Sequence, residues 1–404
     1  MTWTAAPSFV LIEGDEVLSL SALQHRLGRL LDQAPASQAL LVQGRSASTV
    51  LMGLLAALTH QRTVYLVRDP QALPFDLTWH AAQDWCFHEA PTAEQPPTLW
   101  LQTSGTTGRP KCVAHRLDAL LAPLSSGAQG RATWLLSYEP ASFAGLQVLL
   151  SALIGGHTLA HRPPGLAPGA LVDWVARQGI THASGTPTFW RAFARAAGDN
   201  PLPLQHITLG GELADQPTLD MLRQRFPAAQ LRHIYATTET GVVFHVRDGL
   251  AGFPADWIGK TLPQGVELGL SARSTLLVGR TGQADAPVDT GDVIGLDAGR
   301  AYFKGRADSL INVGGHKVFP EEVETHLLTL PWVTDVRVSA QPSPITGAIL
   351  TADIVVQTNE APEQQLRQRL QAHLQALPRH ARPALLRFKD ELKVGASHKK
   401  ARTP

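Results

Sequence analysis

Helix-like and strand-like spacings of apolar residues alternate along this chain of 404 residues. Near the start, the pattern predicts helices at Leu20–Leu31 and Thr49–Leu58, the first capped by Ser19 or Ser21, and strands at Ala39–Gln43 and Thr63–Arg68. A strand, a helix and a second strand in this order form a βαβ unit, whose two strands run parallel. The pattern therefore indicates an α/β protein with a largely parallel sheet.

The pattern changes near the end of the chain. After Asp308, two strand patterns are followed by one helical pattern, at Val333–Ser339, Ala348–Val356 and Glu363–Leu377. This order is typical of a compact α+β unit. We therefore expect a large domain at residues 1–307 and a small domain at residues 308–404.

A loop rich in glycine and hydroxyl side chains follows the apolar run at residues 99–101. It reads Thr-Ser-Gly-Thr-Thr-Gly-Arg-Pro-Lys, from Thr103 to Lys111. Glycines let backbone N–H groups approach phosphate oxygens, hydroxyl groups add uncharged donors, and the lysine adds a positive charge. The loop therefore predicts a polyphosphate site, although it lacks the Gly-Lys-Ser/Thr ending of a Walker A loop. An ordinary Ser/Thr/Gly surface loop is the alternative.

Four further motifs follow this loop in a fixed order. They are Tyr235–Gly241, Asp289–Asp292 with Gly305–Asp308, Asn312–Glu324 and Ser397–Arg402. Together with the loop they resemble the adenylate-forming superfamily, which includes acyl-CoA synthetases, aryl acid–AMP ligases, nonribosomal adenylation domains and luciferases. The resemblance runs from residue 99 to the C-terminus. Because only 102 residues precede Thr103, we expect a shortened first subdomain.

The resemblance implies that ATP and Mg²⁺ are bound by these motifs. Thr238 would contact the α-phosphate and Glu239 would hold Mg²⁺, a cation that prefers oxygen ligands. The β- and γ-phosphates would be bound by the loop residues Thr103, Ser104, Gly105, Thr106, Thr107, Gly108 and Lys111.

The same resemblance places the nucleoside and the catalytic lysine. Gly211 and Glu212 would lie beside the adenine, on which Tyr235 would stack. Asp292 would accept hydrogen bonds from both ribose hydroxyls, and Arg306 would fix the same sugar from the other side. Lys399 would bridge the carboxylate substrate and the α-phosphate, although Lys393 and Lys400 are nearby and His398 replaces a family glycine.

The residues alone leave other roles open for these side chains. Glu239 could be a carboxylate at a helix N-terminus. Asp292 could belong to ordinary turn chemistry, and Arg306 could form a surface ion pair.

A second half-reaction is implied for the C-terminal domain. In the family this domain rotates about a hinge residue, here Asp308, and brings a glycine segment, here Gly314 and Gly315, to the active site for attack by a thiol. The thiol would belong to CoA or to the phosphopantetheine of an acyl carrier protein, and the sequence does not separate the two. The glycine pair could equally be a turn between strands.

The acid-binding pocket is expected between residues 137 and 188 and around residues 210–236. Phe143, Phe189, Trp190 and His233 are candidate walls, and they favour an aryl or apolar acyl carboxylic acid. Amino-acid-activating relatives carry an aspartate where this chain has Phe143, although Glu139 is close. The alternatives are therefore an amino-acid adenylating enzyme that loads a carrier protein, or an adenylate-binding protein that has lost catalysis.

Composition limits the other classes of function. The net charge is +1, so no basic field indicates binding to nucleic acid or to an anionic membrane. The longest apolar runs are too short to span a bilayer. Two cysteines and an acidic start without a signal-peptide pattern predict a cytoplasmic protein.

Overall fold

The computed structural model describes residues 4–32, 39–68, 85–88, 98–102, 111–122, 124, 130–282, 286–357 and 361–392. The chain forms two compact units, and each unit consists of three segments that are separate in the sequence. The first unit is Met1–Ser184, Pro201–Thr208 and Ala236–Val242, and the second is Gly185–Asn200, Leu209–Tyr235 and Val243–Pro404. No helix in the described ranges is long and apolar enough to cross a membrane.

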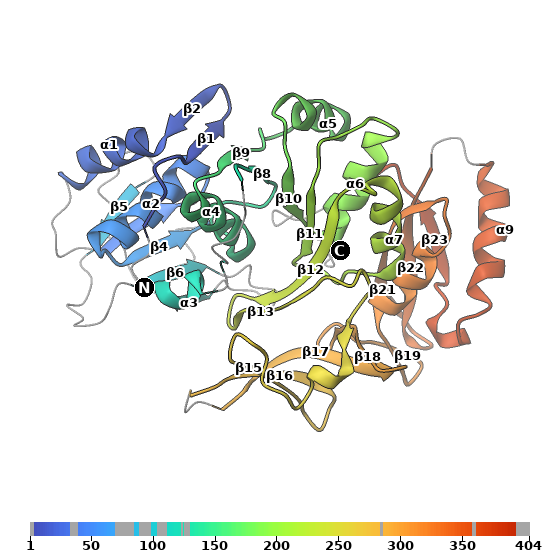
Figure 1. Cartoon of the computed structure of the whole chain (residues 1–404). Coiled ribbons are helices and arrows are strands. Elements are labelled where there is room, and N and C mark those ends of the chain that lie inside the picture. The colour runs from blue at the N-terminus through green and yellow to red at the C-terminus, as the bar shows by residue number, and fades with distance from the viewer. Residues whose placement is uncertain are drawn as a thin grey trace. The chain divides into compact units, whose positions relative to one another are not determined.

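The expected βαβ unit opens the first compact unit. The strands β3 (Ala39–Gln43) and β4 (Val64–Val67) pair in parallel, and α2 (Ala47–His60) connects them and packs against both (Figure 1). They belong to a sheet ordered β5-β3-β4-β6-β7. The other strands are β5 (Trp85–His88), β6 (Thr98–Gln102) and β7 (Cys112–Arg116).

Five strands of an eight-stranded sheet follow one another in the neighbour order β10-β8-β9-β1-β2. These strands are β1 (Val10–Glu13), β2 (Glu16–Ser19), β8 (Thr133–Leu136), β9 (Thr158–His161) and β10 (His182–Gly185). The other helices of the first unit are α1 (Leu20–Leu31), α3 (Leu117–Leu121), α4 (Phe143–Gly155) and α5 (Pro168–Arg177). The helix α1 has the predicted bounds, and Ser19 is its cap because the Ser19 hydroxyl accepts from the Ala22 N–H at 3.2 Å.

The second unit begins with alternating helices and strands. They are α6 (Pro187–Ala197), β11 (His206–Gly210), α7 (Gln216–Arg225), β12 (Gln230–Thr237) and β13 (Gly241–Val246), of which β11, β12 and β13 also contribute residues to the first unit. An antiparallel sheet ordered β14-β18-β17-β16-β15 follows. It consists of β14 (Phe253–Pro254), β15 (Val266–Leu270), β16 (Thr275–Arg280), β17 (Val288–Asp297) and β18 (Arg300–Arg306).

The C-terminal elements have a hydrophobic core of their own. They are β19 (Ile311–Val313), β20 (His316–Val318), α8 (Pro320–Leu328), β21 (Val333–Ser343), β22 (Gly347–Val356), α9 (Glu363–Leu374) and β23 (Leu385–Phe388). The buried residues of this core all lie between Ile311 and Ala381. The α+β composition predicted for this segment is therefore confirmed, and the division of the chain at residues 307 and 308 stays a prediction.

A carboxylate holds the start of α2 in the first unit. Glu13, at the end of β1, accepts from the backbone N–H groups of Ala47 (2.6 Å) and Ser48 (3.1 Å) and lies 2.7 Å from Nδ1 of His161. Burial alone would raise the pKa of the Glu13 carboxyl, but hydrogen bonds with His161, Ser48 and Ala47 lower it to about 2. The carboxylate therefore joins two strands to a helix N-terminus, where a negative charge is favoured.

We predict that Glu13→Gln lowers the free energy of unfolding at pH 5 by about 1.5–3 kcal/mol, the range for hydrogen bonds to a charged group. Because the folded-state pKa lies below the usual 4.5, the stabilisation is present above pH 4.5 and is lost as the pH falls towards 2. Urea denaturation at pH 5 and pH 3 should therefore show a smaller gap between the proteins at pH 3.

Glu16→Gln is the control for this measurement, because Glu16 pairs with Arg26 at the surface, where ion pairs contribute little. A gap for Glu13→Gln that does not change with pH would contradict the role assigned to the carboxylate.

Candidate active site

Three of the predicted nucleotide-binding side chains meet in the second unit. Tyr235 lies near the end of β12, and its hydroxyl donates to Oδ2 of Asp292 at 2.5 Å. Arg306, at the end of β18, has Nη1 3.8 Å from Oδ1 of the same aspartate. Burial and the neighbouring Asp292 carboxylate raise the pKa of Tyr235, so the hydroxyl remains a donor. The cluster presents carboxylate, phenol and guanidinium groups, which suit a sugar with two hydroxyls.

The pairing of two strands brings Asp292 and Arg306 together. In the antiparallel register of β17 and β18 these two residues stand opposite each other. The alternative role for Asp292 was that of a turn residue. The side chains that bind backbone N–H groups here are those of its neighbours Asp289 and Thr290. Asp289 accepts from the Gly291 N–H at 2.9 Å, and Thr290 Oγ1 accepts from the Asp292 N–H at 3.2 Å. Gly291 itself has φ +74°, and a Cβ there would lie 3.3 Å from Arg306.

Arg306 also contacts the predicted hinge residue. Its Nε and Nη2 donate to the two carboxylate oxygens of Asp308 at 3.0 and 3.1 Å, and its Nη1 donates to the Thr290 carbonyl at 3.1 Å. The side chain is 46% exposed, so the surface ion pair that was the alternative role is present as well. The predicted sugar site and the predicted hinge are thus joined through the Arg306 guanidinium.

The Thr-Glu motif lies in a turn of the first unit. Thr238 and Glu239 connect β12 to β13, and Thr237 Oγ1 accepts from the Thr240 N–H at 3.1 Å to close the turn. The alternative that Glu239 stands at a helix N-terminus is therefore wrong, because both flanking elements are strands. Glu239 is exposed at this turn.

His115 is a neighbour of this turn that the sequence analysis missed. It lies on β7, four residues after Lys111, and is buried, and its Nε2 has no hydrogen-bond partner among the residues that the structure describes. Burial lowers the pKa of His115, and the Glu239 carboxylate raises it in part. Side chains alternate between the two faces of a strand, so His115 faces away from the exposed Ala114 and Arg116. This alternation does not predict that His115 lies near Glu239.

The adenine-side turn follows β11. Gly211 has φ +83°, a conformation that favours glycine, and Glu212 Oε2 accepts from the Thr188 N–H at 3.0 Å at the start of α6. Tyr235 stacks on Phe303, with ring centroids 4.7 Å apart, and on Phe244 at 5.3 Å. Adenine stacking on Tyr235 stays a prediction.

The candidate walls of the acid pocket have structural contacts as well. Phe143 tilts against His115 in the first unit, with centroids 5.7 Å apart. In the second unit Phe189 stacks on Phe193 at 5.7 Å, and buried His233 has Nε2 3.0 Å from the Leu250 carbonyl, to which it can donate. Burial lowers the pKa of His233, so the neutral ring is favoured. The role of these three residues in acid binding stays a prediction.

The glycine pair of the C-terminal domain forms a hairpin turn. Gly314 (φ +59°) and Gly315 (φ +88°) connect β19 to β20, and the Gly314 N–H donates to the Thr346 carbonyl at 2.9 Å. Two consecutive positive φ angles are typical of a two-residue turn that requires glycine. The predicted turn is therefore present, and its role in thiol attack stays a prediction.

Some of the predicted site lies outside the described residues. This applies to Thr103, Ser104, Gly105, Thr106, Thr107 and Gly108 of the phosphate loop and to the catalytic candidate Lys399, with Lys393 and Lys400. Lys111, at the start of β7, is described and exposed.

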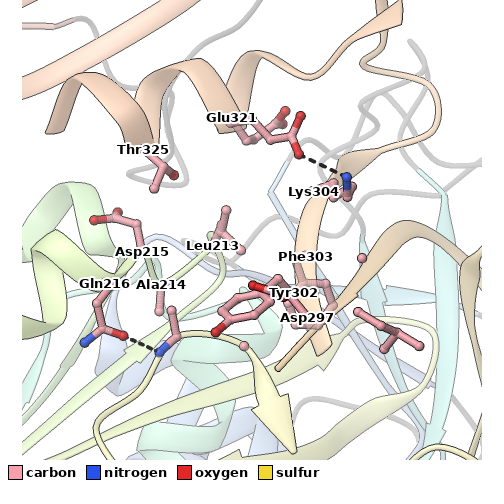
Figure 2. Close-up of a pocket in the computed structure, with 15 residues that line it drawn as sticks. Leu213, Ala214, Asp215, Gln216, Asp297, Tyr302, Phe303, Lys304, Glu321 and Thr325 are labelled. Atoms are coloured by element: carbon pink, nitrogen blue, oxygen red, sulfur yellow. Dashed lines mark hydrogen bonds and ion pairs between the residues drawn. The ribbon is translucent and has the colours of Figure 1, made fainter. Parts of the chain in front are cut away.

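A cavity of about 460 Å³ lies in the second unit, between α8 and the segment that follows the adenine-side turn (Figure 2). Its walls include Leu213 to Gln216, the end of β17, the middle of β18, and Glu321, Glu322 and Thr325 of α8. Phe303 lines this cavity and also stacks on Tyr235. Of the residues predicted for ATP binding, those that the structure describes do not line it.

The described side chains could bind Mg²⁺ only together with the phosphates of a nucleotide. Within the described ranges, no group of three or more His, Cys, Asp or Glu side chains is placed to hold a metal ion. Mg²⁺ is commonly bound by one or two carboxylates together with substrate phosphates, so the exposed carboxylate of Glu239 fits this pattern.

The fold and the tyrosine–aspartate–arginine cluster define a protein of the adenylate-forming class. The chain belongs to the AMP-binding enzyme family, whose model matches residues 18–279, and the model of the AMP-binding enzyme C-terminal domain matches residues 322–399.

Relatives and solved structures agree with this family. Human mitochondrial acyl-coenzyme A synthetase ACSM2B is 26% identical over 331 residues, which are 72% of this chain and 57% of the relative. A structure of MenE from E. coli with bound OSB-AMS is similar with a TM-score of 0.71 and 21% identity, covering 95% of this chain and 93% of that one. The anthranilate CoA ligase AuaEII in complex with anthranoyl-AMP also has a TM-score of 0.71, with 17% identity and coverage of 98% and 93%. These structures show the α/β fold with its small C-terminal domain.

We predict that Asp292→Asn weakens ATP binding by about 1.5–3 kcal/mol, because a charge-assisted hydrogen bond to the ribose is lost. Isothermal titration with ATP and with 2′,3′-dideoxy-ATP checks this. The variant and the wild type should differ for ATP and agree for the dideoxy analogue. Asp297→Asn, at the far end of the same strand, is the control. A difference that persists with the analogue would remove Asp292 from the sugar site.

Proposed function

We propose that this protein activates a carboxylic acid with ATP to form an acyl adenylate and then transfers the acyl group to a thiol. The observation that carries the proposal is the Tyr235–Asp292–Arg306 cluster, in a chain that belongs to the AMP-binding enzyme family and also matches its C-terminal domain. The chain spans 57% of the length of the human acyl-coenzyme A synthetase, so the activity is inferred from the residues that are present.

In the first half-reaction, a carboxylate oxygen of the acid attacks the α-phosphorus of ATP. The new oxygen–phosphorus bond forms as the bond to pyrophosphate breaks. Two anions must approach in line, so the protein must neutralise their charge with donors that are already in place. Asp292 and Arg306 would hold the ribose, Thr238 the α-phosphate, and Lys399 would bridge the two reacting anions. Bound Mg²⁺, held by Glu239, would neutralise phosphate charge.

In the second half-reaction, the thiol sulfur attacks the acyl carbonyl carbon and AMP leaves. Asp308 would be the hinge about which the C-terminal domain turns, and the Gly314–Gly315 turn would border the path of the thiol. The pairing of Asp308 with Arg306 supports this, because a change at the hinge acts directly on a side chain of the sugar site. CoA or the phosphopantetheine of a carrier protein would supply the thiol.

An aryl or apolar acyl acid is the substrate class that we propose. Phe143 has no charge with which to bind an α-ammonium group. The neighbouring Glu139 is engaged by Arg68, whose Nε lies 2.9 Å from its carboxylate. The solved relatives named above carry OSB-AMS and anthranoyl-AMP, and both names support an aryl acid. An amino acid would need a carboxylate that is not already paired.

ATP–pyrophosphate exchange across a panel of acids tests the function. Benzoate, anthranilate and hexanoate represent the proposed class, and phenylalanine and alanine represent the amino-acid alternative. Exchange should depend on Mg²⁺ and should be at least about tenfold faster with an aryl or acyl acid. Faster exchange with an amino acid would replace the proposed substrate class. Exchange with none of a broad set of acids, together with measurable ATP binding, would favour a protein that has lost catalysis.

Lys399→Ala should reduce adenylation by about 10²-fold or more and leave ATP affinity and thioester formation from supplied acyl adenylate largely unchanged, because the lysine stabilises charge in the first transition state. Pyrophosphate exchange and thiolysis of the isolated adenylate measure the two steps. Lys400→Ala and Lys393→Ala are the matched controls. If either control has the large effect instead, the catalytic lysine has been assigned to the wrong residue.

A further inference from the structure

The helix α6 carries a positively charged side chain that is buried against the start of α7 and against β21. Arg191, in the middle of α6, is 6% exposed. Its Nη1 donates to Asp215 Oδ2 at 3.2 Å and to Thr218 Oγ1 at 3.0 Å, and its Nη2 donates to Thr188 Oγ1 at 3.0 Å. Its Nε donates to Asp335 Oδ1 at 3.0 Å. All three nitrogens of the guanidinium therefore have acceptors.

These acceptors come from the two parts of the family fold. Arg191 and Asp215 lie within residues 18–279, which match the AMP-binding enzyme model. Asp335 is on β21, within residues 322–399, which match the C-terminal domain model. Beside it, Arg195 Nη1 donates to Thr334 Oγ1 at 3.4 Å. A buried ion pair thus connects α6 to the C-terminal core.

The same network reaches the turn predicted to lie beside the adenine. Thr188 accepts from Arg191 through its hydroxyl and donates its backbone N–H to Glu212 Oε2 at 3.0 Å. Asp215 caps α7, because its Oδ1 accepts from the Thr218 N–H at 2.8 Å, and it also lines the cavity below α8 (Figure 2). A movement of Arg191 would therefore change hydrogen bonds at the turn, at the start of α7 and at β21.

The charges around Arg191 allow the connection to β21 to open. The carboxylates that face the guanidinium are those of Asp335, Asp215, Glu212 and Glu324. If Asp335 moved away, Asp215 would still pair with Arg191, so no unpaired charge would be left buried. Asp335 is 15% exposed and would be hydrated. Removing Arg191, in contrast, would leave two carboxylates without their shared partner, which is strongly destabilising.

We propose that Arg191 is a positioning residue that couples the nucleotide-side turn at residues 210–212 to the docking of the C-terminal core through Asp335. The ion pair is closed in the arrangement seen here and opens when the C-terminal core leaves α6. It therefore sets the balance between adenylation and thioester formation. This inference rests on the proposed function for its two half-reactions, while the coupling itself concerns only ATP binding and docking.

Asp335→Asn tests the proposal, because it removes the charge without changing the size of the side chain or leaving Arg191 unpaired. We expect the ratio of the rates of pyrophosphate exchange and of thiolysis of supplied acyl adenylate to change about fivefold or more, the size of a typical coupling between sites. Asp335→Glu, which keeps the charge, should restore most of the wild-type ratio.

Asp353→Asn is the matched control. Asp353 pairs with Arg337 Nη2 at 2.6 Å across β21 and β22, so this ion pair lies entirely within the C-terminal core. The control should lower stability without changing the ratio of the two rates. An unchanged ratio in Asp335→Asn, or an equal change in Asp353→Asn, would overturn the proposal.

Hydrogen exchange of residues 333–343, with and without saturating ATP, separates this inference from the proposed function. In the wild type, ATP should change the exchange rate of β21, and in Asp335→Asn this response should be lost. The measurement needs no turnover, so it decides on the coupling even if no acid supports pyrophosphate exchange. The same response to ATP in both proteins would show that Asp335 does not couple the two parts.

Discussion

The antiparallel register of β17 and β18 is the constraint on which the candidate site depends. It places Asp292 opposite Arg306, and each residue then has a second partner. Asp292 accepts from Tyr235, which brings β12 to the sheet, and Arg306 pairs with Asp308, which starts the connection to the C-terminal core. A shift of one residue would turn Asp292 to the other face of the sheet and separate all four groups.

One partly buried charge, Glu13, and one buried charge, Arg191, hold elements that are distant in sequence, and both have more than one partner. Glu13 joins β1, the start of α2 and β9, and Arg191 joins α6, the start of α7 and β21. Several partners are needed because the cost of removing a charge from water exceeds what one hydrogen bond returns. The two sites differ in one respect. Asp335, one partner of Arg191, belongs to the C-terminal core. If Asp335 moved away, Arg191 would remain paired with Asp215.

Two ion pairs bear on the two half-reactions that we propose for this chain. Asp308 pairs with Arg306 of the predicted sugar site. Asp335 pairs with Arg191, which contacts the turn predicted to lie beside the adenine through Thr188. Both contacts connect the C-terminal segment to nucleotide-binding candidates through an ion pair. Ion pairs can be exchanged at lower cost than buried apolar area, so they suit the domain movement that we propose.

The sequence by itself determined the local elements and the chemistry available. Apolar spacing predicted α1 to the residue, the strand–helix–strand unit of β3, α2 and β4, and the α+β character of the C-terminal segment, because each of these follows from local periodicity and capping. Motif order predicted that Tyr235, Asp292 and Arg306 belong to one site, and the structure brings them together.

Only the tertiary structure decided which side chains meet across the fold. It placed His115 near Glu239, put the Thr-Glu motif in a turn between strands instead of at a helix N-terminus, and paired Arg191 with Asp335, 144 positions further along the chain. Such contacts depend on strand register and on how helices pack, and neither is encoded in the spacing of neighbouring residues. The residues around Arg191 in the sequence do not indicate that Asp335 is its partner, because Asp335 belongs to the C-terminal core.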